Sequence, residues 1–248
     1  MLAKLKRALR SIIESRGYFV RPTSEFGFVL GHDIRRLLGD LQRPQIIDVG
    51  ANAGQWLRSI KTEFPQARVV CYEPDARIFA ALQRTAAEFA DVECVPCALG
   101  RDAGTLTLHR NADSVTSSLL QPIVPSHDVP YASKLKPLDR APVEVRTLSD
   151  ELQRMRIDQV DLLKTDCQGF DLAVLQGGAR AIEDGRVRLI ATEALFHLEY
   201  EGQSWFQETL AWLNARGFSF IGLYDVMHDA RGRAIFGDAL FARNDAIR

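Results

Sequence analysis

The sequence predicts an α/β protein whose core is one open, mostly parallel, doubly wound sheet. From residue 45 onward, short apolar runs alternate with longer amphipathic segments, as βα units do. A glycine-rich turn follows the first of these runs and leads into a candidate helix. The apolar runs number seven, enough for such a sheet, and cover residues 45–49, 68–72, 92–98, 160–165, 187–192, 219–224 and 239–242.

The composition is that of an ordinary globular chain. Of the 248 residues 46% are hydrophobic and 25% charged, which excludes disordered and collagenous proteins. The net charge of −1 supplies no global field that would attract nucleic acid or an anionic membrane. No stretch approaches the roughly 20 apolar residues that span a bilayer, and no signal-peptide pattern is present. The chain has four cysteines, Cys71, Cys94, Cys97 and Cys167, which are too few for a disulfide scaffold. We therefore expect a cytoplasmic protein.

Residues 1–44 precede the first strand and are expected to form a helical cap. Within 1–21, six Lys or Arg residues accompany the single acid Glu14. Such a basic amphipathic helix can bind a membrane or an anionic glycan, or it can simply cap the core with a solvated cationic face. We favour the cap, so membrane contact is the less favoured interpretation. The sequence does not fix the oligomeric state.

Helical spacing of apolar residues predicts four helices between the strands, at 56–64, 76–90, 170–184 and 204–216. The last is the clearest, because Ser204 and Gln207 have capping-box spacing and Gly217 offers a C-terminal stop. Residues 100–159 interrupt the alternation with strand-like segments and with a stretch that contains Pro122, Pro125, Pro130 and Pro137, and they predict a β/loop insertion. The expected organisation is a cap at 1–44 and one domain at 45–248 that contains this insertion.

The turn after the first strand is the most informative segment. Glycine lets a backbone approach a ligand closely and adopt a positive φ angle. Gly50 and Gly54 are four residues apart, which differs from the dinucleotide fingerprint, and no P-loop lysine follows. Phosphate binding is therefore disfavoured at this turn.

Glu73 ends the second strand, nineteen residues past Gly54. At this place an α/β nucleoside site has a carboxylate that accepts hydrogen bonds from both ribose hydroxyls. Capping of the following helix would also explain an acid here, but the preceding glycine turn favours the ligand.

These features together resemble the class I S-adenosylmethionine-dependent methyltransferases, and more closely the FkbM family. The resemblance covers roughly residues 44–243 and implies a Rossmann-like sheet of seven strands with an antiparallel last strand. It implies methylation of hydroxyl groups on sugars or other small metabolites. One departure is Gln168, where family members more often have an acid. The motifs that carry the resemblance are 48–55 (DVGANAGQ), 72–74 (YEP), 98–100 (ALG), 117–119 (SSL) and 163–170 (LKTDCQGF).

The resemblance also implies roles for individual residues. Asp48 would steer the methionyl amino group, and Ala98 would contact the adenine through its backbone. The remaining cofactor residues would be Gly50, Ala51, Asn52, Gly54, Gln55 and Glu73, and the substrate-binding residues Ser117 and Ser118.

Hydroxyl methylation needs a base or a divalent ion near the transferred methyl group. Asp166 and Glu193 end neighbouring predicted strands, and His197 follows Glu193 by four residues. If a helical turn begins at Glu193, the three side chains share one rim. They could then bind Mg²⁺ or Mn²⁺, or His197 could act as the base with an acid orienting it. We expect Lys164 to be an ion-pair partner on the face of the sheet rather than a catalytic group.

The sequence therefore predicts an O-methyltransferase that uses S-adenosylmethionine and acts on a sugar, glycan precursor or small metabolite, without nucleic acid as a partner. Two alternatives stay open. One is a Rossmann-type NAD(P)-dependent oxidoreductase, which the glycine spacing disfavours. The other is a binding module that keeps the cofactor pocket without catalysis.

Overall fold

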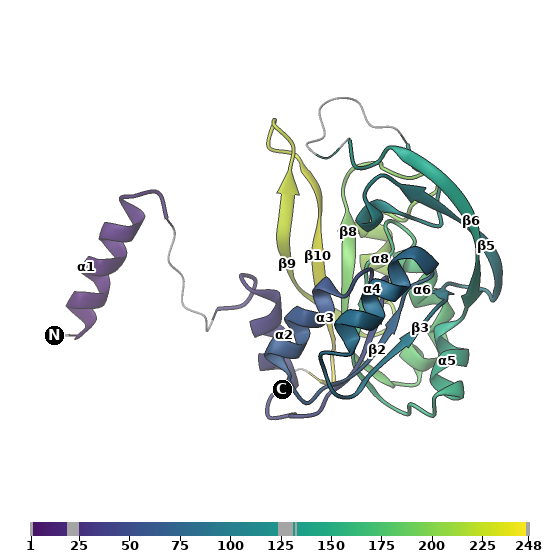
Figure 1. The fold of residues 1–248 in the computed structure, drawn as a ribbon. Helices are drawn as coiled ribbons and strands as arrows, with labels where there is room; N and C mark the ends of the chain where they lie inside the picture. Colours follow the sequence, from purple (N-terminus) through teal and green to yellow (C-terminus); the bar gives the residue numbers. More distant parts are fainter. Residues whose placement is uncertain (1, 19–24, 124–130, 132, 247–248) are drawn as a thin grey trace.

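The fold was described from a computed structural model, which defines all residues except 1, 19–24, 124–130, 132 and 247–248. Its core is a seven-stranded sheet in the order β3-β2-β1-β7-β8-β10-β9 (Figure 1). The pairs among β3, β2, β1, β7 and β8 are parallel, whereas β10 is antiparallel to both of its neighbours. The predicted fold class, with its antiparallel last strand, is confirmed. The bounds are β1 Gln45–Val49, β2 Arg68–Tyr72, β3 Val92–Val95, β7 Val160–Thr165, β8 Val187–Leu195, β9 Phe218–His228 and β10 Ala234–Arg243.

Helices cover both faces of this sheet, and each face has its own apolar core. On one side, buried residues of α2 (Leu30–Leu38), α3 (Gln55–Glu63) and α4 (Ala76–Ala86) pack against the strands. On the other side the covering helices are α5 (Leu148–Arg154), α6 (Asp171–Gly177), α7 (Ala179–Glu183) and α8 (Phe206–Asn214). Because β1, β2 and β7 lie between two layers, nearly all of their residues are buried.

The insertion forms a second, three-stranded sheet in the order β4-β6-β5. The predicted third strand, 92–98, splits because Pro96 has no N–H to donate to a ladder. Its first part is β3, and its end becomes β4 (Ala98–Leu99), which pairs with β6 (Pro137–Arg146). β6 also pairs with β5 (Gly104–Asn111), and a 3₁₀ turn η1 (Ser114–Thr116) follows β5. The strands of the insertion were predicted, whereas part of its loop lies outside the described residues.

The predicted helices are present, with corrected ends. The segment 170–184 is two helices that meet at Gly178, and α5 follows a cap in which the Asp150 N–H donates to Thr147 Oγ1 at 3.1 Å. The predicted capping box at Ser204 is shifted by one residue. The Trp205 N–H donates to Glu208 Oε2 at 2.8 Å, and the Ser204 hydroxyl instead donates to the Gly169 carbonyl.

The N-terminal region contains two helices of different character. α2 is held against the sheet by buried Ile34 and Leu38, and Tyr224 Oη donates to Asp33 Oδ2 at 2.8 Å. α1 (Leu2–Glu14) instead leaves Leu5 and Leu9 exposed. Among the described residues, no helix is long and apolar enough to cross a membrane.

Candidate functional site

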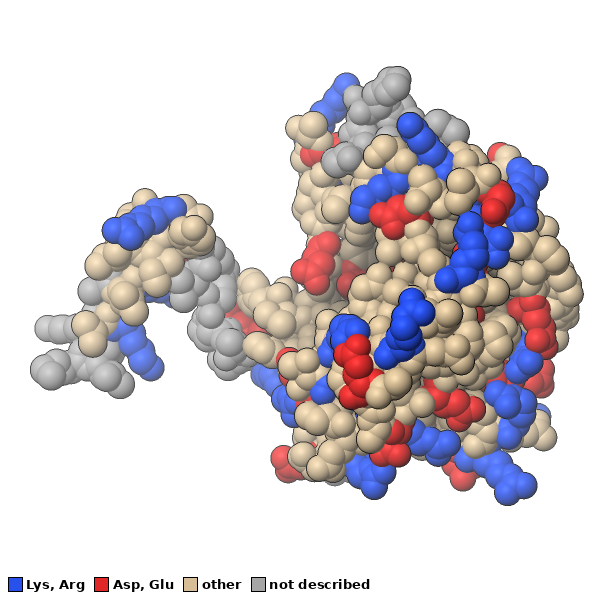
Figure 2. All heavy atoms as spheres, in the orientation of Figure 1, with Lys and Arg blue, Asp and Glu red and all other residues tan. Residues whose placement is uncertain are grey.

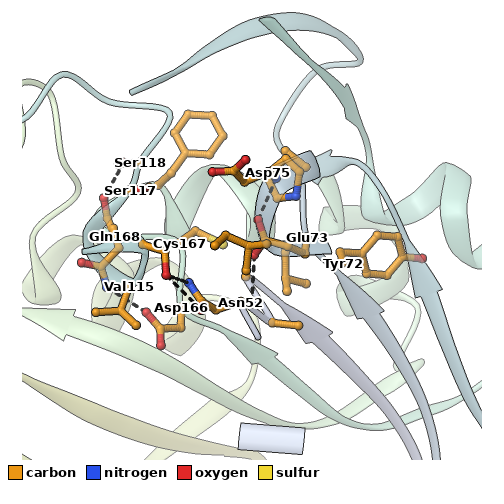
Figure 3. Close-up of a pocket in the computed structure, with 18 of the residues that line it drawn as sticks. Asn52, Tyr72, Glu73, Asp75, Val115, Ser117, Ser118, Asp166, Cys167 and Gln168 are labelled. Carbon is orange, nitrogen blue, oxygen red and sulfur yellow. Dashed lines mark hydrogen bonds between the residues drawn. The ribbon is translucent and has the colours of Figure 1, made fainter. Parts of the chain in front are cut away.

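A pocket opens where β1, β2 and β7 end, at the carboxyl edge of the sheet (Figure 3). Open α/β sheets bind their ligands at this edge. The cavity measures about 230 Å³. The residues that line it and enter the argument below come from the glycine turn, the end of β2, the insertion and the segment after β7: Gly50, Ala51, Asn52, Gln55, Trp56, Glu73, Asp75, Ala98, Leu99, Ser117, Ser118, Lys164, Asp166 and Gln168.

Gly50 brings the turn after β1 into contact with the segment after β7. Its φ of 78° lies in the left-handed region, and a Cβ atom here would come within 2.1 Å of the Asp166 carbonyl oxygen. The N–H groups of Gly50 and Ala51 both donate to the Tyr72 carbonyl at 3.0 Å. The turn is thereby fixed to the ends of both neighbouring strands, and only glycine fits.

Glu73 is the buried carboxyl group at the tip of β2. The Asn52 N–H donates to Oε2 at 2.9 Å, and the Asp75 N–H donates to Oε1 at 2.7 Å (Figure 3). Burial raises the pKa of Glu73 to about 7, although these two hydrogen bonds oppose the shift. Each oxygen accepts one backbone hydrogen bond and retains a further lone pair, so the carboxyl group can still receive hydroxyl donors from the pocket.

Asp75 connects this pocket to the insertion. Its side chain accepts the Arg77 N–H at 3.0 Å as the N-cap of α4. Arg110, on β5, binds both carboxylate oxygens, at 2.9 and 3.1 Å. Burial alone would raise the pKa of Asp75, but the two arginines together hold it below its usual value. A rigid bidentate pair therefore joins β5 to the turn that holds Glu73.

Lys164 is a buried ammonium group between two carboxylates. Its Nζ lies 3.2 Å from Asp48 Oδ1 and 3.5 Å from Asp166 Oδ2, and 5.7 Å from the Trp56 ring centroid. Burial would lower the pKa of Lys164, but attraction to the two carboxylates raises it. Asp48 has no other partner for its carboxylate oxygens among the described residues, and it does not line the pocket. The predicted ion-pair role of Lys164 is confirmed, and Asp48 contacts the pocket only through it.

Asp166 and Glu193 are joined by the side chain of Gln168. Its Nε2 donates to Asp166 Oδ1 at 2.9 Å and to Glu193 Oε1 at 3.0 Å. Its Oε1 accepts from Tyr200 Oη at 3.0 Å, so the orientation of the amide is fixed. The Asp166 side chain remains 41% exposed, whereas Glu193 Oε2 is buried and has no hydrogen-bond partner among the described residues. Of the two acids, Asp166 is the one that lines this first pocket.

A second cavity of about 270 Å³ adjoins the first and shares Val115, Asp166 and Gln168 with it. Carboxyl groups dominate its polar lining. Burial and the nearby Asp166 raise the pKa of Asp238 to about 7, and burial with the surrounding carboxylates raises that of Glu193 well above its usual value. Burial also raises the pKa of Glu199 to about 7. The lining residues are Val115, Thr116, Tyr131, Lys134, Asp166, Gln168, Glu193, Glu199, Asp225, Met227, Phe236, Gly237 and Asp238.

The two predicted serines lie at the first cavity. Ser118 Oγ donates to the Gln168 carbonyl at 2.8 Å and accepts the Leu120 N–H at 3.0 Å. Ser117 Oγ accepts the Asn111 N–H at 3.2 Å. Neither serine lines the second cavity. Ser118 holds the insertion against the segment after β7, whereas the bond of Ser117 lies within the insertion. Their predicted contact with a substrate remains a prediction.

Three predicted site residues do not line either cavity: Asp48, Gly54 and His197. At Gly54, a Cβ atom would lie 2.7 Å from the Thr85 methyl group, so glycine is needed there for packing against α4. The other predicted residues, Gly50, Ala51, Asn52, Gln55, Glu73, Ala98, Ser117, Ser118, Asp166 and Glu193, line one cavity or both.

The predicted grouping is correct for Asp166 and Glu193, which line the same cavity, and wrong for His197, which does not. β8 continues to Leu195, so no helical turn begins at Glu193. His197 lies beyond the strand, where its carbonyl accepts from Gln203 Nε2 at 2.8 Å. Within the described part of the chain, no three His, Cys, Asp or Glu side chains are arranged to hold a metal ion, which corrects the predicted Mg²⁺ or Mn²⁺ site.

The sequence does not predict the residues whose role depends on contacts between segments that are distant in the chain. Gln168 was noted only as a departure from a motif, and Asp75, Arg110 and Asp238 were not singled out. For Asp238 the signal was an acid in the middle of an otherwise apolar strand, directly opposite Glu193 in the β8–β10 register. For Arg110 the sequence gives no such signal, because its partner is 35 residues away.

Comparison with known proteins gives a consistent picture. The model of the methyltransferase FkbM domain matches residues 48–220. Methyltransferase sdnD of Sordaria araneosa is 29% identical over 155 residues, 54% of this chain and 60% of the relative, so the chain spans less than two thirds of that protein. The 2-O-methyltransferase NoeI of Sinorhizobium fredii is 26% identical over 212 residues, 82% of each chain. Among solved structures, the METTL16 methyltransferase domain aligns with a TM-score of 0.48 and 12% identity over 86% of this chain and 65% of its own.

Proposed function

The chain belongs to the FkbM methyltransferase family, and we propose from this that it transfers a methyl group from S-adenosylmethionine to a hydroxyl group. One observation carries the choice of site. Asp166, a carboxylate that a ligand can reach, lines both of two adjoining cavities. We assign the cofactor to the first cavity and the methyl acceptor to the second, within a methyltransferase domain at 45–248.

The first cavity fits a nucleoside cofactor. The Glu73 carboxyl group has free lone pairs for two ribose hydroxyls, and the turn at Gly50 has no side chain that would obstruct the ligand. Ala98 and Leu99 offer apolar surface for a base, and Asn52 and Gln55 offer polar groups for the methionyl part. In this proposal Asp48 acts through Lys164 and does not touch the ligand.

The bound cofactor supplies an electrophilic methyl group on a neutral leaving group. The chain must then align an acceptor oxygen with that methyl group and remove its proton. As the acceptor oxygen forms its bond to carbon and the carbon–sulfur bond breaks, the hydroxyl becomes strongly acidic. A carboxylate can therefore accept this proton, and we assign the proton to Asp166.

Two neighbours prepare Asp166 for this role. The Lys164 ammonium lies 3.5 Å from Asp166 Oδ2, and the Gln168 amide fixes the rotation of the carboxylate. These two contacts still leave 41% of the Asp166 side chain exposed. Asp166 is thus a positioned base at the boundary of the two cavities.

The second cavity suits an acceptor rich in hydroxyl groups. Carboxyl groups accept hydrogen bonds from hydroxyls, and Lys134, the only ammonium among the described lining residues, is 3.2 Å from Asp113. Among these residues, an acceptor that carries phosphate would meet carboxylates and no unpaired cation. We propose a sugar, a glycan precursor or another polyhydroxy metabolite. Transfer to an oxygen atom agrees with the name of the related 2-O-methyltransferase.

Calorimetry and a turnover assay test the proposal. Titration with S-adenosylmethionine should show binding to one site, and titration with NAD should show none. Tight NAD binding would favour the oxidoreductase alternative, which the family match disfavours. Release of S-adenosylhomocysteine in the presence of a panel of sugars should then depend on Asp166. Binding without turnover on any hydroxyl acceptor would favour the non-catalytic alternative.

A further inference from the structure

The helix α1 has an apolar face that no described residue covers. Leu5, Leu9 and Ile12 are spaced by four and three residues, so they lie on one side of the helix. Their exposed fractions are 67%, 58% and 55%. Single exposed leucines are ordinary on protein surfaces, but three on one helical face form a continuous patch that requires an explanation.

The opposite side of the same helix is cationic. At 100° per residue, Lys6, Arg7 and Arg10 fall outside the apolar sector, and all three are exposed. The only acid of the helix, Glu14, accepts from Arg10 Nε at 2.7 Å. Figure 2 shows blue side chains on this helix, whereas blue and red are interspersed over the body of the molecule.

The role of a core cap applies to α2 and not to α1. Ile34 and Leu38 of α2 are 1% and 4% exposed, because they pack against α3 and the sheet. None of the α1 side chains that the structure describes belongs to either apolar core, and the helix stands apart from the sheet in Figure 1. The cap interpretation, favoured from the sequence, is therefore not supported for α1.

We propose that α1 binds the surface of an anionic lipid membrane, lying in the interface with Leu5, Leu9 and Ile12 among the acyl chains and its cations at the headgroups. A strong separation of apolar and basic faces is typical of interfacial helices. An anionic glycan would satisfy the charges but leave the apolar face in water. A membrane covers both faces at once, so it is the occupant that the helix fits.

Flotation of the full-length protein with lipid vesicles tests this. One vesicle type is phosphatidylcholine alone, and the other also contains phosphatidylglycerol. A variant with Leu5→Gln, Leu9→Gln and Ile12→Gln removes the apolar face but retains good helix formers. A second variant, with Lys6→Gln, Arg7→Gln and Arg10→Gln, removes the charge. Matched controls change exposed residues of the body: Leu138→Gln, 62% exposed, and Arg101→Gln with Arg180→Gln.

The wild type should float with the anionic vesicles, and the bound fraction should fall as salt is added. Each cation near such a surface is worth roughly a fivefold gain in partition, so the charge variant should lose on the order of a hundredfold. The apolar variant should lose at least about tenfold. The body controls should bind as the wild type does.

Three results would overturn the proposal: no flotation with anionic vesicles, equal flotation with both vesicle types, or full retention by the apolar variant. If the apolar variant retains full binding and also binds a soluble anionic polysaccharide such as heparin, an anionic glycan would be favoured as the partner of α1. All variants should keep the melting temperature and the affinity for S-adenosylmethionine of the wild type, because α1 contributes to neither core nor pocket. The result is thereby independent of the proposed activity.

Discussion

At the scale of single residues, Glu73 should make cofactor affinity depend on pH. Ribose hydroxyls donate to the carboxylate form more strongly than to the acid form, and burial raises the pKa of Glu73 to about 7. Ligand binding therefore competes with protonation. We expect the affinity for S-adenosylmethionine to increase by up to about tenfold between about pH 6 and about pH 8, measured by calorimetry.

The control for this prediction is Glu73→Gln. The amide keeps the shape and cannot titrate, so the affinity should be weaker at every pH and should not vary across this range. A pH dependence that persists in the variant would assign the titration to another group. Glu73→Ala should weaken binding further, because it also removes the acceptor of the Asn52 and Asp75 N–H groups.

Asp166→Asn should remove the base and leave the cofactor site intact. Positioned bases contribute about 10² to 10⁴ in rate, so we expect a loss of this size in kcat, measured by release of S-adenosylhomocysteine. The Asn side chain can retain a neutral contact with Gln168, so the affinity for the cofactor should change by less than about threefold. The matched variant Glu193→Gln, at a carboxyl group whose pKa is raised, should keep most of the activity. Equal rates for Asp166→Asn and wild type would refute the assignment.

Gln168→Glu tests the amide that joins two acids. The amide now donates to Asp166 Oδ1 at 2.9 Å and to Glu193 Oε1 at 3.0 Å. A carboxylate at position 168 would lie equally close to both acids. Three adjacent acids cannot all be charged, so one more proton must be held in the cluster. We expect the lower limb of the kcat profile to move to higher pH. An unchanged profile would mean that Gln168 does not position Asp166, whereas Gln168→Met should lower kcat without that movement.

At the scale of elements, the sequence predicts the bounds of those strands that are buried along their whole length. β1, β2 and β7 have the predicted bounds, because each is a short apolar run buried on both faces. β8, β9 and β10 are longer than predicted. Their added residues extend past the end of β7, and Glu193, Asp225 and Asp238 in this part line the second cavity. Period-two patterns do not reveal such extensions.

The same reasoning explains which parts of the site were predictable. The glycine turn and Glu73 are local signals at strand ends, and the structure places both at the first cavity. The contacts of Lys164, Gln168 and Arg110 join segments that are far apart in the chain, so no spacing within one motif encodes them. His197 was misplaced because its role depended on where β8 ends, and strand ends are set by the neighbouring strand rather than by local sequence.

Arg110→Met tests the connection between the insertion and the cofactor site. Removal of a buried partner from a carboxylate costs about 1.5 to 3 kcal/mol. Asp75 would then hold Glu73 less firmly, so both the melting temperature and the cofactor affinity should fall. Arg77→Met is the matched control, because Arg77 binds the same two acids, Asp75 and Asp139, but is 41% exposed against 14% for Arg110. If the two variants behave alike, the insertion does not support the pocket.

At the scale of the whole molecule, the acids around the two cavities should make the fold less stable as pH rises. The pKa values of Asp238, Glu199 and Glu73 are each raised to about 7 in the folded state, mainly by burial. Between about pH 4.5 and 7 the folded chain binds more protons than the unfolded chain, so its stability decreases across this window. Acids with lowered pKa, such as Glu151, lose their contribution only at more acidic pH. We therefore expect a higher melting temperature near pH 5 than near pH 8.

Asp238→Asn tests whether the decrease of the melting temperature with rising pH comes from the second cavity. Asn keeps the volume of the side chain and removes the charge that burial disfavours, and each pKa unit is worth about 1.4 kcal/mol. Near pH 8 the variant should melt several degrees above the wild type. The difference should become smaller toward pH 5 and vanish only below about pH 4, where the unfolded side chain is protonated as well. Asp184→Asn, at a side chain that is 57% exposed, should follow the wild type throughout. If Asp238→Asn also melts as the wild type does at every pH, the second cavity is better hydrated than its lining indicates. Its carboxylates are then charged at neutral pH and can accept hydrogen bonds from the hydroxyl groups of the acceptor.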